Sequence, residues 1–230
     1  MLNHSRFLLF LVPLASLCLP SAAFGRDHQV IVFYTTDIHG RLSAAPDIIG
    51  MDTIAALKKA TPNSLLVDAG DYIQGNPLVN LTKGENAIRL MKLAGYDAAA
   101  VGNHEFDFGL EALRARMAEA AAEPSAFPML CANILKADGA PLAKPWTILT
   151  VDGLKVGLFG LTTEETAVQT HPKNVAGLSF ADVTATAQKT ADELCAQCCD
   201  IVIALAHVGT DGVIGTKSTD IAARTKGIDV

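Results

Sequence analysis

The sequence contains no run of basic residues, and its acidic side chains outnumber the basic ones. The 230 residues include 24 Asp and Glu against 18 Lys and Arg, which gives a formal net charge of -6. Because nucleic-acid-binding proteins concentrate positive charge on one face, we do not expect a nucleic acid polymer as the partner. The chain also lacks internal repeats and low-complexity segments. Its hydrophobic content of 50% predicts a globular protein with a large buried core.

The chain has no apolar run long enough to span a bilayer. Its most apolar N-terminal stretch, Phe7 to Leu19, follows Arg6 and precedes small residues that lead up to Gly25. This stretch is shorter than the roughly 20 residues that a membrane-spanning helix needs. The layout is typical of a secretory signal peptide. We therefore expect residues 1–25 to be cleaved, residues 26–230 to remain without a membrane attachment, and the location to be periplasmic or secreted.

Few cysteines are present, and most of them lie close together. Removal of the expected signal peptide leaves Cys131, Cys195, Cys198 and Cys199. In an exported protein these four could oxidise, with three pairings possible. Cys195 and Cys199 have helical i, i+4 spacing and could instead share a metal ion. The favoured interpretation is that they are small apolar residues packed under the following strand, because free cysteine is often buried.

Apolar runs alternate with helical patterns along the chain. We expect strands at residues 30–36, 64–67, 97–101, 128–132, 146–151, 155–161 and 201–206, and helices at about 48–60, 85–94, 110–122, 181–199 and 218–226. Residues 71–83 read as a loop. The turn Asp152-Gly153 predicts an antiparallel hairpin, which a purely parallel sheet would not contain. The pattern predicts a layered α/β fold with mixed sheets.

Four polar clusters each follow an apolar run that predicts a buried strand. The clusters are Asp37-Ile38-His39, Gly70-Asp71, Gly102-Asn103-His104-Glu105 and Ala206-His207. We expect these strands to lie side by side and parallel, so that the clusters meet at their carboxyl ends. Carboxylate, imidazole and amide groups together suit a pair of divalent transition ions better than calcium or a thiolate site.

The clusters differ in how specifically they indicate a metal site. A single Asp-x-His pair is more often a turn than a ligand pair. Asp71 follows a glycine that permits close backbone approach, and its two oxygens could be shared by two ions. Asp68 is expected to be structural, at the end of its strand. For the third cluster, the alternative is a turn in which Asn103 and Glu105 cap the helix that begins near Leu110, with His104 as a capping or core histidine.

The segments TTDIHGRL, LLVDAGDYIQGNP, VGNHEFDFG and ALAHVGTDG resemble the calcineurin-like metallophosphoesterases, and within them the secreted bacterial 5′-nucleotidases and UDP-sugar hydrolases. The resemblance runs from about Val30 to Val230 and implies an α/β/β/α metallophosphatase sandwich. It also implies two divalent metal ions, Mn, Zn or similar. Asp37 and His39 would hold one ion, Asp71 would bridge both, and Asn103 and His207 would hold the second.

The resemblance further implies a phosphomonoesterase that acts on nucleotides or other small phosphoesters through a metal-activated water. His104 would contact the phosphoryl group, and Asp107 would orient its imidazole. Two metal ions can activate a water and neutralise phosphate charge, and a protonated imidazole can stabilise or protonate the departing alkoxide. The loop 72–77 looks most like the nucleotidase form, although hydrolysis of UDP-sugars or 2′,3′-cyclic nucleotides stays open.

Members of the family complete the site with a Gly-His-x-His segment after a strand that begins Gly-Ile-Asp. This sequence reads Gly227-Ile228-Asp229-Val230 and stops. We therefore expect a C-terminally incomplete catalytic domain that lacks the nucleotide-binding C-terminal domain. The alternative is a catalytically impaired periplasmic remnant that binds metal or phosphate weakly.

Overall fold

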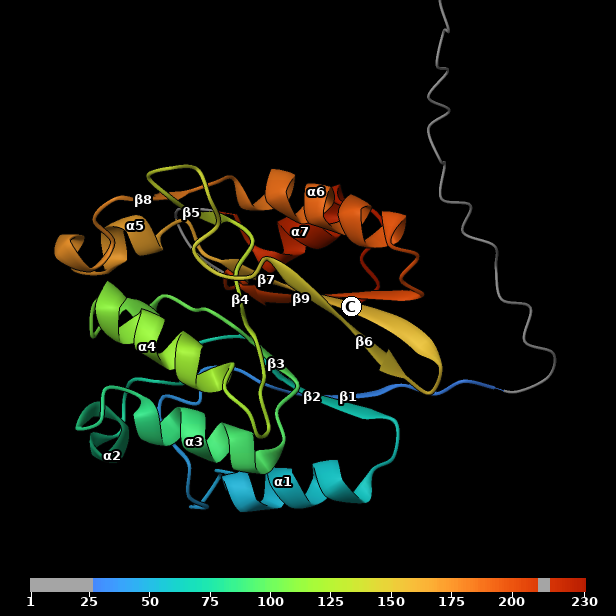
Figure 1. Ribbon diagram of the computed structural model, residues 1–230, viewed down its shortest axis with the longest axis horizontal. Helices are drawn as coiled ribbons and strands as arrows, with labels where there is room; N and C mark the ends of the chain where they lie inside the picture. Colours follow the sequence, from blue (N-terminus) through green and yellow to red (C-terminus); the bar gives the residue numbers. More distant parts are fainter. Residues whose placement is uncertain (1–26, 211–215) are drawn as a thin grey trace, which may run out of the picture.

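The computed structural model describes residues 27–210 and 216–230 (Figure 1). The expected signal peptide, residues 1–25, lies outside the described residues. In the described part of the chain, no helix is both long and apolar enough to cross a membrane.

The first half of the chain forms a four-stranded parallel sheet. Its strands follow the order β1-β2-β3-β4, and they are β1 (Ile31–Thr35), β2 (Ser64–Asp68), β3 (Ala98–Ala100) and β4 (Met129–Leu130). One face is covered by α1 (Met51–Ala60), α3 (Glu85–Ala94) and α4 (Leu110–Ala120) (Figure 1). Strand β2 is buried at every position, as its apolar run predicts. Helix α3 ends at Gly95, which adopts the left-handed conformation expected of a terminating glycine.

The second half forms a mixed three-stranded sheet in the order β6-β7-β9. The predicted hairpin joins β6 (Trp146–Val151) to β7 (Leu154–Thr162) in antiparallel pairing, and β9 (Ile201–His207) lies parallel to β7. Helices α6 (Val183–Ala196) and α7 (Ser218–Arg224) lie over this sheet (Figure 1). The remaining elements are α2 (Pro77–Asn80), β5 (Ile134–Lys136), α5 (Thr166–Gln169), β8 (Leu178–Phe180) and the 3-10 turns η1 (His104–Phe106) and η2 (Pro172–Asn174).

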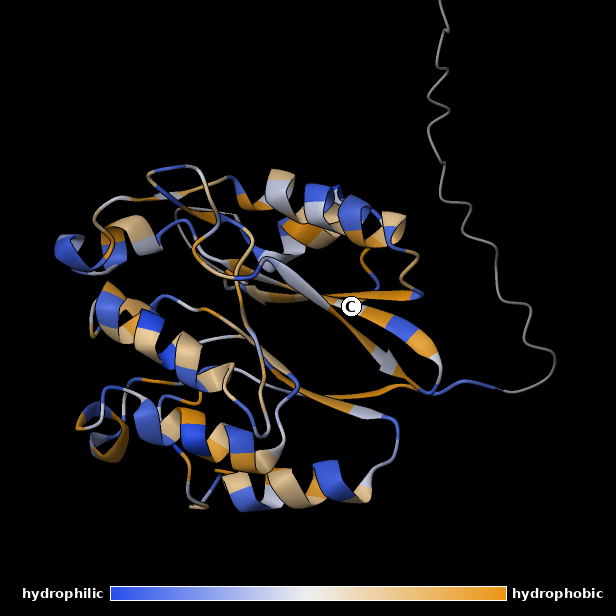
Figure 2. Ribbon diagram, in the orientation of Figure 1, coloured by the Kyte–Doolittle hydropathy of each residue, from blue (hydrophilic) through white to orange (hydrophobic). Residues whose placement is uncertain are grey.

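The two sheets pack face to face, with helices outside both. One buried cluster joins Leu65 and Ala100 of the first sheet to Val156, Leu158 and Ile203 of the second. Figure 2 shows hydrophobic residues along the strands between the sheets and hydrophilic residues on the outward parts of the helices. One parallel and one mixed sheet, packed between helices, confirm the predicted layered α/β fold.

Three expectations about the elements were wrong. The fourth cluster does not follow a strand of the same sheet as the others, because β9 pairs with β7 in the second sheet. The predicted loop 71–83 contains the short helix α2, which Pro77 favours at its first position and the Asn76 side chain caps through the Leu78 amide. The predicted helix 181–199 begins later, because Asp182 caps its start by accepting from the Ala185 amide, and it ends earlier, before Cys198, which has a left-handed φ of 59°.

The cysteines follow the favoured interpretation in part. Cys131, Cys195 and Cys199 carry free thiols, so none of the three pairings among the four is formed. Cys199 packs against the buried cluster of the second sheet, as predicted. Cys195 is exposed, because it faces outward on the last turn of α6. Among the described residues, no possible metal-holding group includes a cysteine.

Candidate metal centre

The polar clusters that follow β1, β2, β3 and β9 meet at one end of the two sheets. Two groups of side chains each place ligand atoms within 4.8 Å of one another, and Asp71 belongs to both. The first group contains His39, Asp71 and His104, and the second contains Asp37, Asp71 and His207. The fifth expected ligand, Asn103, joins through its side-chain oxygen, which lies 3.1 Å from His207 Nε2. The structure thus brings the five expected ligands together, but its groups place His39 with His104 and Asp37 with His207 rather than Asp37 with His39.

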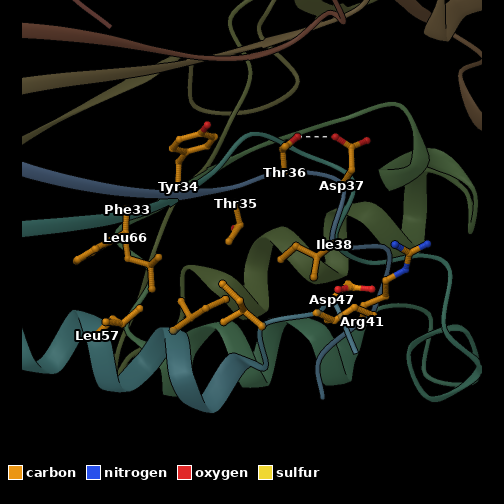
Figure 3. Close-up of a pocket in the computed structure, with 13 residues that line it drawn as sticks. Phe33, Tyr34, Thr35, Thr36, Asp37, Ile38, Arg41, Asp47, Leu57 and Leu66 are labelled. Atoms are coloured by element: carbon orange, nitrogen blue, oxygen red, sulfur yellow. Dashed lines mark hydrogen bonds between the residues drawn. The ribbon is translucent and has the colours of Figure 1, made fainter. Parts of the chain in front are cut away.

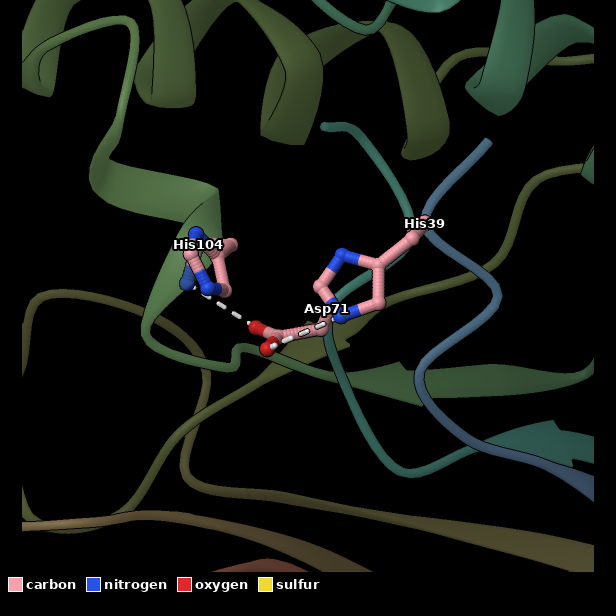
Figure 4. Close-up of side chains that lie close together, drawn as sticks. All are labelled: His39, Asp71 and His104. Carbon is pink, nitrogen blue, oxygen red and sulfur yellow. Dashed lines mark hydrogen bonds and ion pairs between the residues drawn. The ribbon is translucent and has the colours of Figure 1, made fainter. Parts of the chain in front are cut away.

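Asp71 lies at the middle of this arrangement (Figure 4). Its side chain is only 3% exposed, and Oδ2 lies 3.1 Å from His207 Nε2 and 4.0 Å from His39 Nε2. Its Oδ1 accepts a hydrogen bond of 2.9 Å from the His104 backbone amide. One carboxylate therefore faces imidazoles that come from both sheets.

The backbone around Asp71 is tightly constrained. A Cβ atom on Gly70 would lie 2.8 Å from His207 Nδ1 and 2.9 Å from Gly102 Cα, so only glycine permits this approach. Asp71 itself has a φ of 66°. This left-handed conformation costs a non-glycine residue on the order of 1 kcal/mol and persists only where surrounding contacts hold it.

Glu105 provides those contacts. The side chain is fully buried, and its two oxygens accept hydrogen bonds from the backbone amides of Asp71, Tyr72, Ile73 and Gly102 at 2.8, 2.8, 3.2 and 2.6 Å. Burial and the nearby Asp71 charge raise the pKa of Glu105 to about 7, against the effect of these amides. The sequence offered only a capping role for Glu105. Three of its four amides lie more than 30 residues earlier in the chain, where local pattern cannot show them.

Both imidazoles on the ligand side are oriented by their Nδ1 atoms. His207 Nδ1 lies 3.0 Å from the Ala69 carbonyl oxygen, which can only accept, so Nδ1 carries the proton of that bond. His39 Nδ1 lies 3.3 Å from the side-chain oxygen of Gln74. Each ring therefore turns Nε2 toward Asp71. Carbonyl and amide partners of this kind fix the orientation of metal-binding histidines.

The ionisation of His207 and that of Asp71 depend on each other. Burial acts to lower the pKa of His207, but the hydrogen bond and charge of Asp71 prevail and raise it to about 9. Burial would raise the pKa of Asp71, yet His207 lowers it. The carboxylate and amide oxygens around His207 Nε2 thus stabilise positive charge there. Oxygen and imidazole donors in this combination fit a divalent transition ion.

The part of the centre nearer β1 is more open. The Asp37 side chain is 53% exposed, and its Oδ1 lies 3.8 Å from His39 Nε2. The Thr36 hydroxyl donates to Asp37 Oδ2 at 2.6 Å. A cavity of about 440 Å³ runs from Asp37 between β1 and α1, with Tyr34, Arg41 and Asp47 among its lining residues (Figure 3).

His104 and Asp107 form a separate pair beside Asp71. His104 Nδ1 lies 2.7 Å from Asp107 Oδ2, and the His104 side chain is 38% exposed. Its ring lies edge-on to that of His39, with centroids 5.1 Å apart. Burial acts to lower the pKa of His104, but the Asp107 hydrogen bond and the charges of Asp71 and Asp107 raise it above its usual range. These contacts favour the protonated form of the His104 imidazole at the solvent-accessible edge of the centre.

Sequence comparison shows what the chain is similar to. The family model of calcineurin-like phosphoesterases matches residues 32–230. A 5′-nucleotidase from Rattus norvegicus is 33% identical over 237 residues, which cover 94% of this chain and 39% of the relative. A 5′-nucleotidase from Vibrio cholerae is 36% identical over 197 residues, which cover 80% of this chain and 34% of the relative. The chain therefore spans well under half the length of these relatives.

Solved structures of known proteins have a similar fold. A calcineurin-like phosphoesterase from Bacillus subtilis superimposes with a TM-score of 0.71 at 29% identity, covering 86% of this chain and 69% of that one. A sulfate thiohydrolase from Thermus thermophilus superimposes with a TM-score of 0.73 at 21% identity, covering 89% and 47%. At that identity the second likeness concerns the fold alone.

Proposed function

Because this chain belongs to the calcineurin-like phosphoesterase family, whose members are metal-dependent hydrolases, we propose that it carries the catalytic site of an exported enzyme that hydrolyses nucleotide phosphomonoesters. The observation that carries the proposal is the buried Asp71, shared between two groups of potential metal ligands. The substrate class is supported by relatives named 5′-nucleotidases. UDP-sugars and cyclic nucleotides are substrates to compare with AMP in the same assay.

We assign the ligands from the family resemblance, supported by the distances of 3.8 Å between Asp37 Oδ1 and His39 Nε2 and of 3.1 Å between Asn103 Oδ1 and His207 Nε2. Asp37 and His39 would hold one divalent ion with Asp71, and Asn103 and His207 would hold a second with the same carboxylate. When bound, such ions activate a water molecule and neutralise charge on the phosphate oxygens. Two of the imidazoles already present Nε2 to the centre, since their Nδ1 atoms are engaged by Gln74 and Ala69.

His104 would act on the substrate. With Nδ1 bonded to Asp107, the opposite ring nitrogen is free to donate a proton to the departing alkoxide or a hydrogen bond to a phosphate oxygen. Asp107 would keep the imidazole protonated and oriented. The partial exposure of His104 leaves room for a substrate beside it.

Export is supported by the sequence and by relatives. Arg6 and the apolar stretch after it have the layout of a signal peptide. Similar proteins include 5′-nucleotidases of snake venom, from Naja atra and Gloydius brevicauda, which are 33% and 31% identical to this chain. We therefore propose that residues 26–230 form the catalytic domain of the exported protein.

The test is phosphate release from AMP by the purified chain in the presence of Mn²⁺ or Zn²⁺, with metal content measured on the same sample. We expect metal-dependent release by the wild type and none above background by Asp71→Asn. Metal binding without any release would favour the weakly binding remnant instead. Equal release by wild type and Asp71→Asn would refute the proposed site.

A further inference from the structure

Glu105 is a buried carboxylate to which the proposed mechanism gives no role. It touches neither solvent nor the open part of the centre, since its exposed fraction is 0%. Burial of a carboxylate is costly unless hydrogen bonds satisfy its oxygens. The contacts that satisfy Glu105 therefore indicate what it does.

Those contacts join two separate loops. Oε1 accepts from the amides of Tyr72 and Ile73, whereas Oε2 accepts from the amides of Asp71 and Gly102. Three of the four amides belong to the loop after β2, and the fourth belongs to the loop after β3. Oε2 accepts from both loops at once, at 2.8 Å from Asp71 N and 2.6 Å from Gly102 N.

Two further contacts lock the same junction. The His104 amide, in the loop after β3, donates to Asp71 Oδ1 at 2.9 Å. In the Glu105 bonds, by contrast, the amides of the loop after β2 are the donors. A Cβ atom on Gly102 would collide with Asp71 Oδ1 and would lie 2.9 Å from Glu105 Oε2. The loops are therefore in direct contact, and no spare volume allows Asp71 to move relative to residue 102.

We propose that Glu105 is a positioning residue that fixes Asp71 relative to Asn103 before any cation arrives. The roles of Asp71 and Asn103 as ligands rest on the proposed function, whereas the junction itself consists of hydrogen bonds between groups of the protein. Glu105 acts through the backbone of both loops and does not touch substrate.

Glu105→Gln is the direct test, because it keeps the shape of the side chain. An amide has one acceptor oxygen, so two of the four backbone amides would face an NH₂ group instead. Glu105→Asp keeps both oxygens on a shorter side chain and serves as the conservative variant. Leu113→Ala is the matched control for lost stability, since Leu113 is a fully buried core residue of α4 outside both loops.

The first measurement is amide hydrogen exchange of the metal-free full chain. We expect exchange at Asp71 and Gly102 to accelerate at least about tenfold in Glu105→Gln beyond any change in overall stability, and much less in Leu113→Ala. The second measurement is calorimetric titration with Mn²⁺. Loss of a group that orients metal ligands typically costs about 10- to 100-fold in affinity, so we expect that loss in Glu105→Gln, partial recovery in Glu105→Asp and none in Leu113→Ala.

The outcomes separate this inference from the proposed function. If Glu105→Gln binds Mn²⁺ like the wild type while Asp71→Asn does not, the positioning role is refuted and the metal centre stands. If the wild type binds neither Mn²⁺ nor Zn²⁺, the proposed function fails, and the exchange experiment still decides whether Glu105 joins the loops. If Glu105→Gln does not fold, Glu105→Asp takes its place and is compared with Leu113→Ala after correction for the overall stability of each variant. Identical exchange at Asp71 and Gly102 in these two variants would overturn the inference.

Discussion

The two carboxylates of the candidate centre occupy opposite environments. Asp71 is 3% exposed, whereas Asp37 is 53% exposed. Both residues have a left-handed backbone, with φ of 52° at Asp37 and 66° at Asp71. The Asp71 side chain accepts from the His104 amide inside the Glu105 junction, whereas the Asp37 side chain accepts from the hydroxyl of the adjacent Thr36. The difference predicts that the buried, shared carboxylate is harder to replace than the exposed one.

The largest loss of activity should come from substitution of the buried carboxylate, Asp71. Asp71→Asn removes the carboxylate shared by both ligand groups, so we expect kcat/KM for AMP to fall on the order of 10³-fold, the size associated with losing a preorganised charge-stabilising group. Because Asp71 belongs to both groups, added Mn²⁺ should not restore activity. Recovery at millimolar Mn²⁺ would show that Asp71 is not more critical than its exposed counterpart.

His104→Asn should have the next largest effect. Loss of a general acid costs about 10²- to 10⁴-fold, and we expect about 100-fold here, since phosphate charge would still be neutralised. The decrease should appear in kcat with Mn²⁺ affinity unchanged, as measured by steady-state kinetics beside calorimetry. A parallel loss of Mn²⁺ affinity would place His104 among the ligands, as its grouping with His39 and Asp71 also allows.

Asp37→Asn should have a smaller and reversible effect. The exposed side chain can be replaced in part by water as a ligand, so we expect about a tenfold loss of activity at low Mn²⁺. Raising the Mn²⁺ concentration should recover most of it. This dependence on metal concentration, absent for Asp71→Asn, is the sharpest check of the contrast between the two carboxylates.

Asp107→Asn should produce the smallest change, seen as a shift with pH. Asp107 helps to raise the pKa of His104, so its replacement should lower that pKa. In the folded wild type the raised pKa means that protonation of His104 stabilises the fold fully below the unfolded value of about 6.5, and this contribution is lost as pH rises through the folded pKa. Titration of the His104 ring by NMR in metal-free protein checks the direction, and an unchanged pKa would contradict it.

Much of this centre could be predicted because its signals are local. Asp37, Asp71 and Asn103 each follow a short apolar run, and the carboxyl ends of β1, β2 and β3 lie together as parallel strands require. The hairpin at Asp152-Gly153 could be predicted for the same reason, since these two adjacent residues favour a tight turn.

What could not be predicted depends on contacts between distant segments. No local pattern distinguishes a strand of the first sheet from β9, which is equally apolar but pairs with β7. Glu105 has the sequence context of a helix cap, and its four amide partners become visible only when the loops after β2 and β3 touch. The two-stranded sheet of β5 and β8 likewise joins segments more than 40 residues apart.

The placement of the centre at the boundary of two sheets has a mechanical consequence. His207 arrives from one layer and Asp71 from the other, with Nε2 and Oδ2 3.1 Å apart. A slip of one residue along a strand, about 3.3 Å, would break this pair, whereas ligand distances in metal sites vary by only about 0.2 Å. A cation bound to both residues would cross-link the two layers in this register, so the layers could not separate without releasing the cation.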